Sequence, residues 1–517
     1  MKHLITLLAL CAASVSQPIQ AQEANGFTPT YKYRIQLTDK KHNPFSLRHP
    51  EQFLSQKSID RRRRQHLKLT KTDLPVTPQY VEQIKAQGVA ICSTSKWNNT
   101  ILVETSDTLL IPRIEALPFV SGARKVATYS RPRRKNTADR HALIRPAEPQ
   151  ANAQPKQSKL EEREDALREM FELSHPNITK DSVDIAVRLF MDAFVMSAQD
   201  DETAADEPAE ETTPKPYNHY GEAATQAEQL NVPALHNRGY RGQGMTIAII
   251  DGGFYNADII PMLQNTRILG TRDFVEPGND VYGEENHGMM VLSCIATNNP
   301  GTFVGTAPEA SFWLLRSEDA DTEQPVEEDN WAAAVEFADS VGADVVNTSL
   351  GYSKYDDPAD KIKYYEMDGR TCLASRTASM MASKGMVLCN SAGNEGDNHW
   401  KLISVPADAD DVLTVGALTS KGENTLFSSL GNSADGRIKP DVMAMGQDCT
   451  VLSPRGTLTQ ANGTSFASPI MCGAVTCYWQ ANPSLTALEV VKAVRALGDR
   501  YEHPDNVYGY GTPNFSK

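Results

Sequence analysis

The sequence predicts an α/β protein: a doubly wound, mostly parallel sheet with helices on both faces, preceded by a small α+β domain of the split-βαβ type. From residue 220 onward, short apolar runs typical of buried parallel strands alternate with helical stretches. Upstream, strand and helix patterns follow each other in the order βαββαβ. A polar stretch at 131–216, rich in proline and acidic residues, separates the two and is typical of a linker.

Length and charge limit the alternatives. A chain of 517 residues is long enough for two or three domains with a sizeable core. The formal net charge of −14 indicates an acidic surface and does not favour a nucleic-acid partner. We expect the basic run 61–64 to form a solvated helix face rather than a nucleic-acid contact.

The first 21 residues have the pattern of a secretory signal peptide. Lys2 and His3 give a polar start, and the apolar run 4–15 is too short to span a bilayer. Ala21, or alternatively Ala13, would be the last residue removed. We therefore expect a secreted, periplasmic or cell-surface protein with no membrane span after signal removal.

Residues 22–130 are predicted to form the small upstream domain. Its strands are expected at 31–37, 89–95, 100–105 and 119–129, and its helices at 78–87 and 108–117. An additional helix at about 50–67 elaborates this plan. Alone, the plan has no fixed function.

The linker at 131–216 carries an insert with helical periodicity, at 160–173 and 181–198, to which we assign no function. Residues 217–517 are predicted to form the larger domain. Its buried strands are expected at 245–251, 310–316, 344–349, 385–391 and 411–418, and its helices include 331–340, 372–384 and 470–480.

The eight cysteines give no zinc-binding pattern. Cys11 leaves with the signal peptide. Four others lie in apolar contexts and are expected to be free: Cys294, Cys389, Cys472 and Cys477. Export permits disulfides, and Cys372 with Cys449 is the candidate pair.

Ser465 lies where a glycine-containing turn enters an apolar helix. Free N–H groups and the helix dipole favour negative charge there, which suits a serine whose attack creates an oxyanion. Pro469 is expected within the first helical turn, where its missing N–H has no intrahelical partner. Because a lone Thr-Ser before a helix is usually an ordinary cap, Ser465 matters only if a base and an acid accompany it.

Three other polar residues follow or open apolar segments. Asp251 ends the strand 245–251, His287 opens an apolar helix, and Asn394 lies in a glycine-rich loop after the strand 385–391. Taken singly, each is more often a turn former, a structural histidine or a loop former than a catalytic residue. Their order along the chain, Asp, His, Asn and Ser, is what gives them meaning together.

This ordered set resembles the subtilisin-like serine peptidases (subtilases, peptidase family S8) over about residues 217–517. The run 463–469 matches the family's nucleophile motif, 391–394 its oxyanion-hole motif, and 347–351 the strand along its substrate cleft. Gly252 and Met289 depart from the Ser or Thr and the Thr that the family usually has there. These departures concern the subfamily and local hydrogen bonding more than the triad.

The resemblance implies a secreted serine endopeptidase that acts through an acyl-enzyme. Asp251, His287 and Ser465 would form the triad, and Asn394 would donate to the oxyanion. Substrate-binding positions would be Ser349, Leu350, Gly351, Ser391, Ala392 and Gly393. The domain at 22–130 would be an inhibitory, chaperone-like propeptide that the enzyme itself cuts near or after Ala127.

Expected partners are protein or peptide substrates and the chain's own propeptide, with no nucleic acid, and the chain is expected to be a monomer. The chemistry would need no cofactor, and no acidic pattern assigns a calcium site. The alternative is a secreted pseudoprotease that binds peptides without cutting them. An α/β-hydrolase, with Asp499 and His503 after Ser465, would leave the motifs around His287 and Asn394 unexplained.

Overall fold

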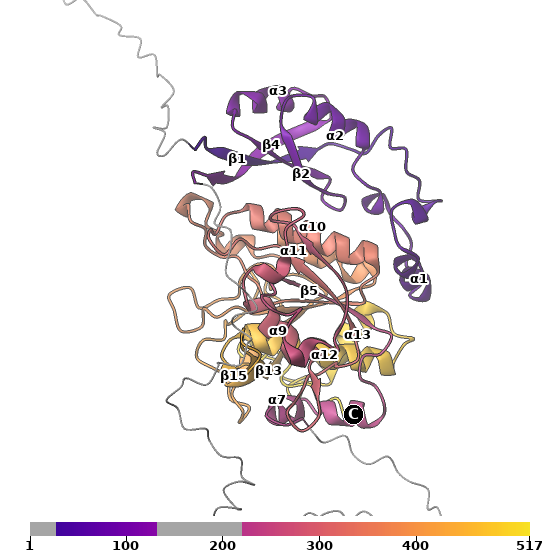
Figure 1. The fold of residues 1–517 in the computed structure, drawn as a ribbon, viewed down its shortest axis with the longest axis vertical. Coiled ribbons are helices and arrows are strands. Elements are labelled where there is room, and N and C mark those ends of the chain that lie inside the picture. Colours follow the sequence, from indigo (N-terminus) through magenta and orange to yellow (C-terminus); the bar gives the residue numbers. More distant parts are fainter. Residues whose placement is uncertain (1–26, 132–219) are drawn as a thin grey trace, which may run out of the picture. The chain divides into compact units, whose positions relative to one another are not determined.

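Seven parallel strands form the central sheet, in the order β13-β12-β11-β10-β5-β9-β6 (Figure 1). The computed structural model describes residues 27–131 and 220–517, which fall in one structural unit. The strands are β5 (Thr246–Asp251), β6 (Arg267–Asp273), β9 (Ser311–Arg316), β10 (Val345–Thr348), β11 (Val387–Ser391), β12 (Leu413–Leu418) and β13 (Val442–Met445).

The inner strands of this sheet follow the predicted apolar runs closely. Every residue of β5, β10, β11 and β12 is buried, as expected for strands covered on both faces. The sequence prediction missed the two outermost strands. β6 alternates exposed and half-buried residues because it lies at one edge of the sheet, and β13 is only four residues long.

Helices cover both faces of the sheet. α10 (Val326–Val341) and α11 (Leu373–Met380) lie on one face, and α9 (His287–Ala296) and α12 (Thr464–Ala481) on the other (Figure 1). The predicted fold class is therefore confirmed. The predicted helix 372–384 is divided into α11 and a 3-10 turn, η9 (Ala382–Lys384), and α12 begins six residues earlier than predicted.

Smaller elements complete the larger domain. The other helices are α7 (Ala224–Glu228), α8 (Val232–Asn237) and α13 (Ala487–Ala496), with 3-10 turns η5 (Pro261–Leu263), η6 (Val281–Gly283), η7 (Pro358–Asp360) and η8 (Tyr364–Glu366). Two hairpins join β7 (Asn298–Asn299) to β8 (Phe303–Val304) and β14 (Cys449–Leu452) to β15 (Leu458–Ala461).

The upstream domain is a four-stranded antiparallel sheet in the order β2-β3-β1-β4, and its βαββαβ plan is confirmed. Its strands are β1 (Thr30–Leu37), β2 (Ala90–Ser95), β3 (Thr100–Thr105) and β4 (Val120–Tyr129). Its helices are α1 (Gln56–Arg64), α2 (Pro78–Lys85) and α3 (Ile111–Glu115), with 3-10 turns η1 (Pro50–Gln52), η2 (Lys71–Asp73) and η3 (Thr108–Leu110). Ile35, Ile84 and Ile101 are fully buried in its core.

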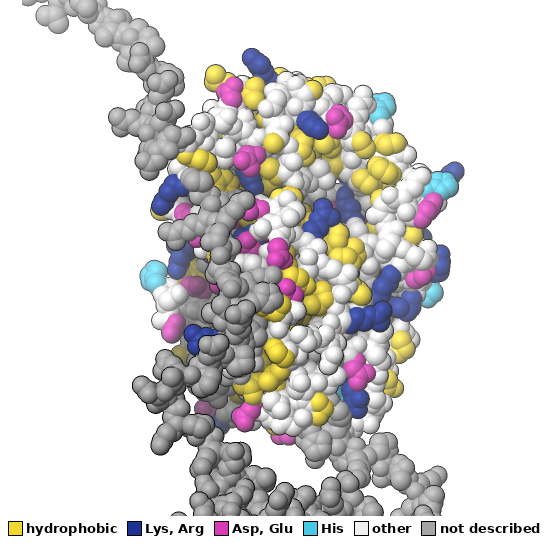
Figure 2. Space-filling model, viewed as in Figure 1, with side chains coloured by type: hydrophobic (Ala, Val, Ile, Leu, Met, Phe, Trp, Pro, Cys, Tyr) yellow, Lys and Arg dark blue, Asp and Glu magenta, His cyan; other side chains and the backbone are white. Residues whose placement is uncertain are grey.

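The prediction of a solvated arginine face on α1 is wrong for half of the run. Arg63 and Arg64 are exposed, and Figure 2 shows Lys and Arg side chains gathered over α1 at the right of the view. Arg61 and Arg62 are buried because they pair with Asp339 of α10. Two arginines of the run therefore pack against the larger domain, and the other two face solvent.

The six cysteines of the larger domain are free thiols. The candidate pair does not form: the Cys372 thiol lies 3.7 Å from the Glu366 carbonyl, and the Cys449 thiol lies 3.3 Å from the Met445 carbonyl. The four cysteines predicted to behave as small apolar residues are buried.

The predicted signal peptide at 1–21 and the predicted helices at 160–173 and 181–198 lie outside the described residues. Within 27–131 and 220–517, every helix is too short or too polar to cross a bilayer.

Candidate active site

Asp251 and His287 meet at the carboxyl end of β5. Asp251 is the last residue of β5 and is buried, and His287 is the first residue of α9. The His287 Nδ1 lies 2.8 Å from the Asp251 Oδ1. The close approach requires glycine at 288, because a Cβ there would lie 2.7 Å from the Asp251 Cβ.

Two neighbouring carboxylates raise the pKa of His287. Burial lowers the pKa of His287, but the charge of Asp251 and its hydrogen bond raise it more, with a further contribution from the Glu285 carboxylate, so the net shift is upward. Glu285 was not predicted, although an acid two residues before the histidine is visible in the sequence. Burial, and then the charge of Asp251, raise the pKa of Glu285, while His287 lowers it.

The second oxygen of Asp251 differs from the first. Oδ1 accepts hydrogen bonds from His287 and from the Gly252 N–H at 2.8 Å. Oδ2 is buried and has no hydrogen-bond partner among the described residues. Gly252 has no hydroxyl to offer, which fits the expected change in local hydrogen bonding at this position.

Ser465 lies at the second position of α12, on the same edge of the sheet. The His287 and Phe466 rings lie 5.9 Å apart between centroids, which brings the start of α12 beside the histidine. The Ser465 hydroxyl donates to the Ser349 carbonyl at 3.4 Å, and within the described part of the chain it makes no hydrogen bond to His287. Nucleophile–base contacts are often loose before substrate binds.

Pro469 does not lie in the first turn of the helix, as predicted, but one turn further in, because α12 begins at Thr464. Proline there cannot donate to the Ser465 carbonyl four residues earlier. The Ser349 hydroxyl donates to that carbonyl instead, at 2.8 Å. Ser349, predicted as a substrate-binding residue, therefore supports the backbone of Ser465.

Thr464, the residue before Ser465, orients the side chain of Asn394. Its side-chain oxygen accepts from the Thr464 N–H at 2.8 Å and the Thr464 hydroxyl at 2.9 Å. Its Nδ2 is therefore the free end, and the structure records no acceptor for it among the described residues. Asn394 is exposed, so Nδ2 can reach a ligand. Thr464 was missed as a positioning residue, although it stands within the motif.

The other predicted substrate-binding positions separate into two groups. Gly351 is exposed, and Leu350 and Gly393 are half-buried. Ser391 and Ala392 are buried, and the Ala392 N–H donates to the Val415 carbonyl of β12. The structure thus brings Ser349, Gly393 and Asn394 next to α12 while Ser391 and Ala392 lie inside the sheet.

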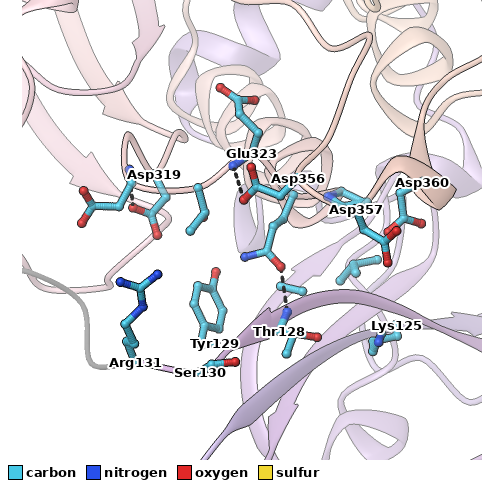
Figure 3. Close-up of a pocket in the computed structure, with 16 residues that line it drawn as sticks. Lys125, Thr128, Tyr129, Ser130, Arg131, Asp319, Glu323, Asp356, Asp357 and Asp360 are labelled. Carbon is cyan, nitrogen blue, oxygen red and sulfur yellow. Dashed lines mark hydrogen bonds between the residues drawn. The ribbon is translucent and has the colours of Figure 1, made fainter. Parts of the chain in front are cut away.

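The end of β4 lies against loops that follow the carboxyl edge. The Thr128 N–H donates to the Gln324 side-chain oxygen at 2.8 Å (Figure 3). Arg124, earlier in β4, pairs with Asp360 at 3.3 Å. A cavity of about 730 Å³ lies between 125–131 and the loops 319–325 and 356–360. The wall formed by the larger domain carries Asp319, Asp321, Glu323, Asp356, Asp357 and Asp360.

A half-buried carboxyl, Glu318, lies between this wall and the site. It accepts from the Tyr352 hydroxyl at 2.7 Å, and Tyr352 follows the predicted substrate strand. Desolvation of the Glu318 carboxyl raises its pKa above the usual value. No sequence pattern singles it out.

Within 27–131 and 220–517, no group of three or more His, Cys, Asp or Glu side chains could hold a metal ion.

Comparison with known proteins gives a family for each domain. The model described as "Subtilase family" matches residues 242–511, and the model described as "Peptidase S8 propeptide domain, Bacteroidota" matches residues 32–141. Subtilisin NAT of Bacillus subtilis subsp. natto is 30% identical over 266 residues, which are 51% of this chain and 62% of that protein. Serine protease AprX of Bacillus subtilis (strain 168) is 29% identical over 324 residues, with 57% and 70% covered.

Among solved structures, the MycP3 protease from the type VII (ESX-3) secretion system is 22% identical, with a TM-score of 0.44, 61% of this chain and 98% of that chain covered. The match to Subtilisin NAT covers less than two thirds of that protein's length. The subtilase model, however, spans more than half of the chain. The chain belongs to the subtilase family (peptidase S8) and carries an N-terminal S8 propeptide domain.

Proposed function

We propose that this subtilase is an exported serine endopeptidase, made as a zymogen that removes its own propeptide. The observation that carries the proposal is the convergence of four groups at one edge of the sheet. Asp251 holds His287, Thr464 orients Asn394, and Ser465 starts the helix beside both.

The proposed reaction begins when the Ser465 hydroxyl leaves the Ser349 carbonyl and attacks a peptide carbonyl carbon. His287 takes the hydroxyl proton through its Nε2, and Asp251 holds the imidazole through Nδ1 and stabilises the imidazolium. The oxyanion would accept from the Asn394 Nδ2 and from the Ser465 N–H, which has no intrahelical acceptor at the second helical position.

Collapse of the tetrahedral intermediate breaks the peptide bond. His287 returns the proton to the leaving amine, and Ser465 keeps the acyl group until water, activated by the same histidine, hydrolyses the ester. These side chains supply nucleophile, base, orienting acid and oxyanion donor, so the proposal calls for no cofactor. Substrate backbone would lie along 349–351, where Gly351 is exposed.

Self-processing is part of the proposal. Ala127 is buried and pairs with Lys32 within the upstream sheet, so a cut at the predicted position would require β4 to open. The connection after Tyr129 is the first part of the chain beyond this pairing. We therefore place the first cut after Tyr129, between the sheet and the larger domain.

The test uses the full-length chain expressed in a host that secretes it and lacks other extracellular proteases. We expect a fluorophosphonate probe to label the wild-type protein and casein to be cut in a probe-sensitive way. Ser465→Ala should do neither and should accumulate as a signal-free precursor, whereas Ser516→Ala, an exposed serine near the C-terminus, should behave as wild type.

Two results would contradict the proposal. A processed wild-type chain that neither reacts with the probe nor cuts casein would be a peptide-binding module. A Ser465→Ala chain trimmed like wild type would mean that another protease matures the enzyme.

A further inference from the structure

One segment of the propeptide lies outside its four-stranded sheet. This arm, residues 55–73, contains α1 and η2 and contacts the larger domain at the amino ends of its strands. The Ser55 N–H donates to the Ser340 carbonyl at 2.9 Å. The side chain of Gln65 donates to the Gly385 carbonyl at 2.9 Å and accepts from the Ala487 N–H at 2.8 Å.

The arm buries charge against the larger domain. Asp339, fully buried on α10, pairs with Arg61 and Arg62 of the arm and with Lys96, which follows β2. Arg61 also donates to the Ala343 carbonyl, and all three cations are at least nine-tenths buried. Asp339 thus has three cationic partners, all from the propeptide.

In a second buried ion pair, the larger domain supplies the cation and the arm supplies the anion. Lys384 of the larger domain pairs with Asp73 of the arm at 3.0 Å, and Asp73 also pairs with Arg62 at 3.0 Å. Burial lowers the pKa of Lys384, while the Asp73 charge raises it, and the net shift is downward. The two domains are therefore complementary in charge sign at two adjacent points, which fixes how the arm binds.

The backbone of the larger domain is shaped around the arm. Gly342 ends α10 and Gly385 ends η9, both with left-handed φ, +86° and +88°. A Cβ at Gly342 would lie 2.7 Å from the Lys57 Cβ, and one at Gly385 would lie 3.0 Å from the Gln65 Nε2. A side chain at Gly342 would require the backbone of the arm to move, and one at Gly385 would displace the Gln65 side chain.

This surface lies away from the candidate active site. Asp344, which pairs with Lys57 at 3.3 Å, precedes β10, and Ser349 follows it. Parallel strands rise about 3.3 Å per residue, so roughly 16 Å separates the two positions. The propeptide therefore contacts both ends of the same sheet, through β4 at one and through the arm at the other.

We propose that the amino-terminal edge of the sheet is a second propeptide-binding site, and that the arm retains the propeptide after the chain is cut between Tyr129 and Tyr220. Such a cut removes the covalent connection but none of the arm's contacts. A ligand held at two sites leaves only when both have opened. Removal of the two arginine charges within the complex would leave the buried Asp339 without most of its partners, which is unfavourable.

The consequence for activity rests on the proposed function: a cut chain would stay inhibited until the arm is released or degraded. Retention itself does not depend on catalysis. The two ideas can therefore fail separately, and the test is carried out on a chain that cannot cut itself.

The experiment uses full-length Ser465→Ala protein with a C-terminal affinity tag. An added protease nicks the connection at 131–220, mass spectrometry verifies the cut, and the rate at which the N-terminal fragment leaves the immobilised protein is measured. We expect the fragment to stay through repeated washes. In the Arg61→Ala/Arg62→Ala variant we expect at least tenfold faster release.

Two further variants separate binding from folding. Arg63→Ala is the matched control, because Arg63 is exposed and pairs with Asp60 inside α1. Lys384→Met leaves the propeptide unchanged and removes the cationic partner of Asp73 from the larger domain, so it should also speed release. Loss of the unaltered fragment in the first wash, or equal release from unaltered and double-variant protein, would overturn the proposal.

Discussion

The two ends of the central sheet hold their polar residues in different ways. At the carboxyl ends of the strands, hydrogen bonds from Ser349 and Thr464 position the start of α12 and Asn394, and Asp251–His287 is the ion pair. At the amino ends, Asp339 and Lys384 are buried among charges that the propeptide supplies.

The polar side chains at the two ends of the sheet also differ in their exposure to solvent. The side chain of His287 is 28% exposed and Asn394 is exposed, whereas Asp339 has no exposed surface. A catalytic edge must leave a base and a donor open to substrate, while a binding site can be fully covered by its ligand. The comparison teaches that one sheet can present an open site and an occupied one at opposite ends.

The largest expected effect is a loss of catalytic rate, and it concerns only the carboxyl edge of the sheet. Asn394→Ala removes the Nδ2 donor, and loss of one oxyanion donor typically lowers kcat by about 10²–10³. KM should change little because the interaction forms in the transition state. Steady-state kinetics of the processed enzyme measure both, and propeptide retention by the arm should be unaffected.

Asn394→Ala also removes the acceptor for Thr464, so a second variant is needed. Asn394→Asp keeps an oxygen for the Thr464 N–H and hydroxyl but has no N–H donor. It should lose rate as severely as Asn394→Ala. If Asn394→Asp kept wild-type kcat, Asn394 would act by holding α12 and not by binding the oxyanion.

A smaller effect is expected on stability, when a neutral hydrogen bond at the carboxyl edge is removed. Ser349→Ala leaves the buried Ser465 carbonyl without a donor, because Pro469 cannot supply one. An unsatisfied buried group costs about 1–3 kcal/mol. We expect a lower free energy of unfolding, measured by denaturant titration in the Ser465→Ala background, which prevents self-digestion.

Thr476→Val is the matched control in the same helix. The Thr476 hydroxyl donates to the Cys472 carbonyl at 2.8 Å, but that carbonyl also keeps its helical N–H donor. The control should lose less stability than Ser349→Ala. Equal losses would show that the proline position carries no special cost.

The sequence predicted the carboxyl edge better than the amino edge for a physical reason. Asp251, His287, Asn394 and Ser465 each lie at a boundary between an apolar element and a turn, which is visible locally. Burial of Arg61 depends on Asp339, 278 residues further along the chain. A charge run alone cannot reveal a partner so distant in sequence.

Element boundaries show the same limit. β5 was predicted to within one residue because its apolar run is continuous, and the edge strand β6 was missed because its residues alternate in exposure. Pro469 was placed too early because α12 starts at Thr464, before the apolar run that was used to predict it. The donor that compensates for this proline, Ser349, comes from a different strand connection.

The smallest expected effect concerns the charge of Glu285, next to the proposed catalytic base His287. The Glu285 carboxylate raises the pKa of His287, in addition to Asp251, and His287 must be unprotonated to act as a base. Removing the Glu285 charge should therefore lower that pKa and move the acid limb of the kcat/KM profile to lower pH. An exposed charge interaction is typically worth only about 0.2–1 kcal/mol, so we expect this change to be the smallest of the series.

Glu285→Gln tests this expectation in the processed enzyme. The wild-type acid limb should lie above pH 6.5, because the net shift of the His287 pKa is upward. The variant should retain the plateau rate and gain activity on the acid side of the limb. Glu284→Gln is the control, since Glu284 pairs with Arg316 at 3.2 Å. A limb that moves to higher pH, or moves equally in both variants, would show that the Glu285 charge does not act on the base.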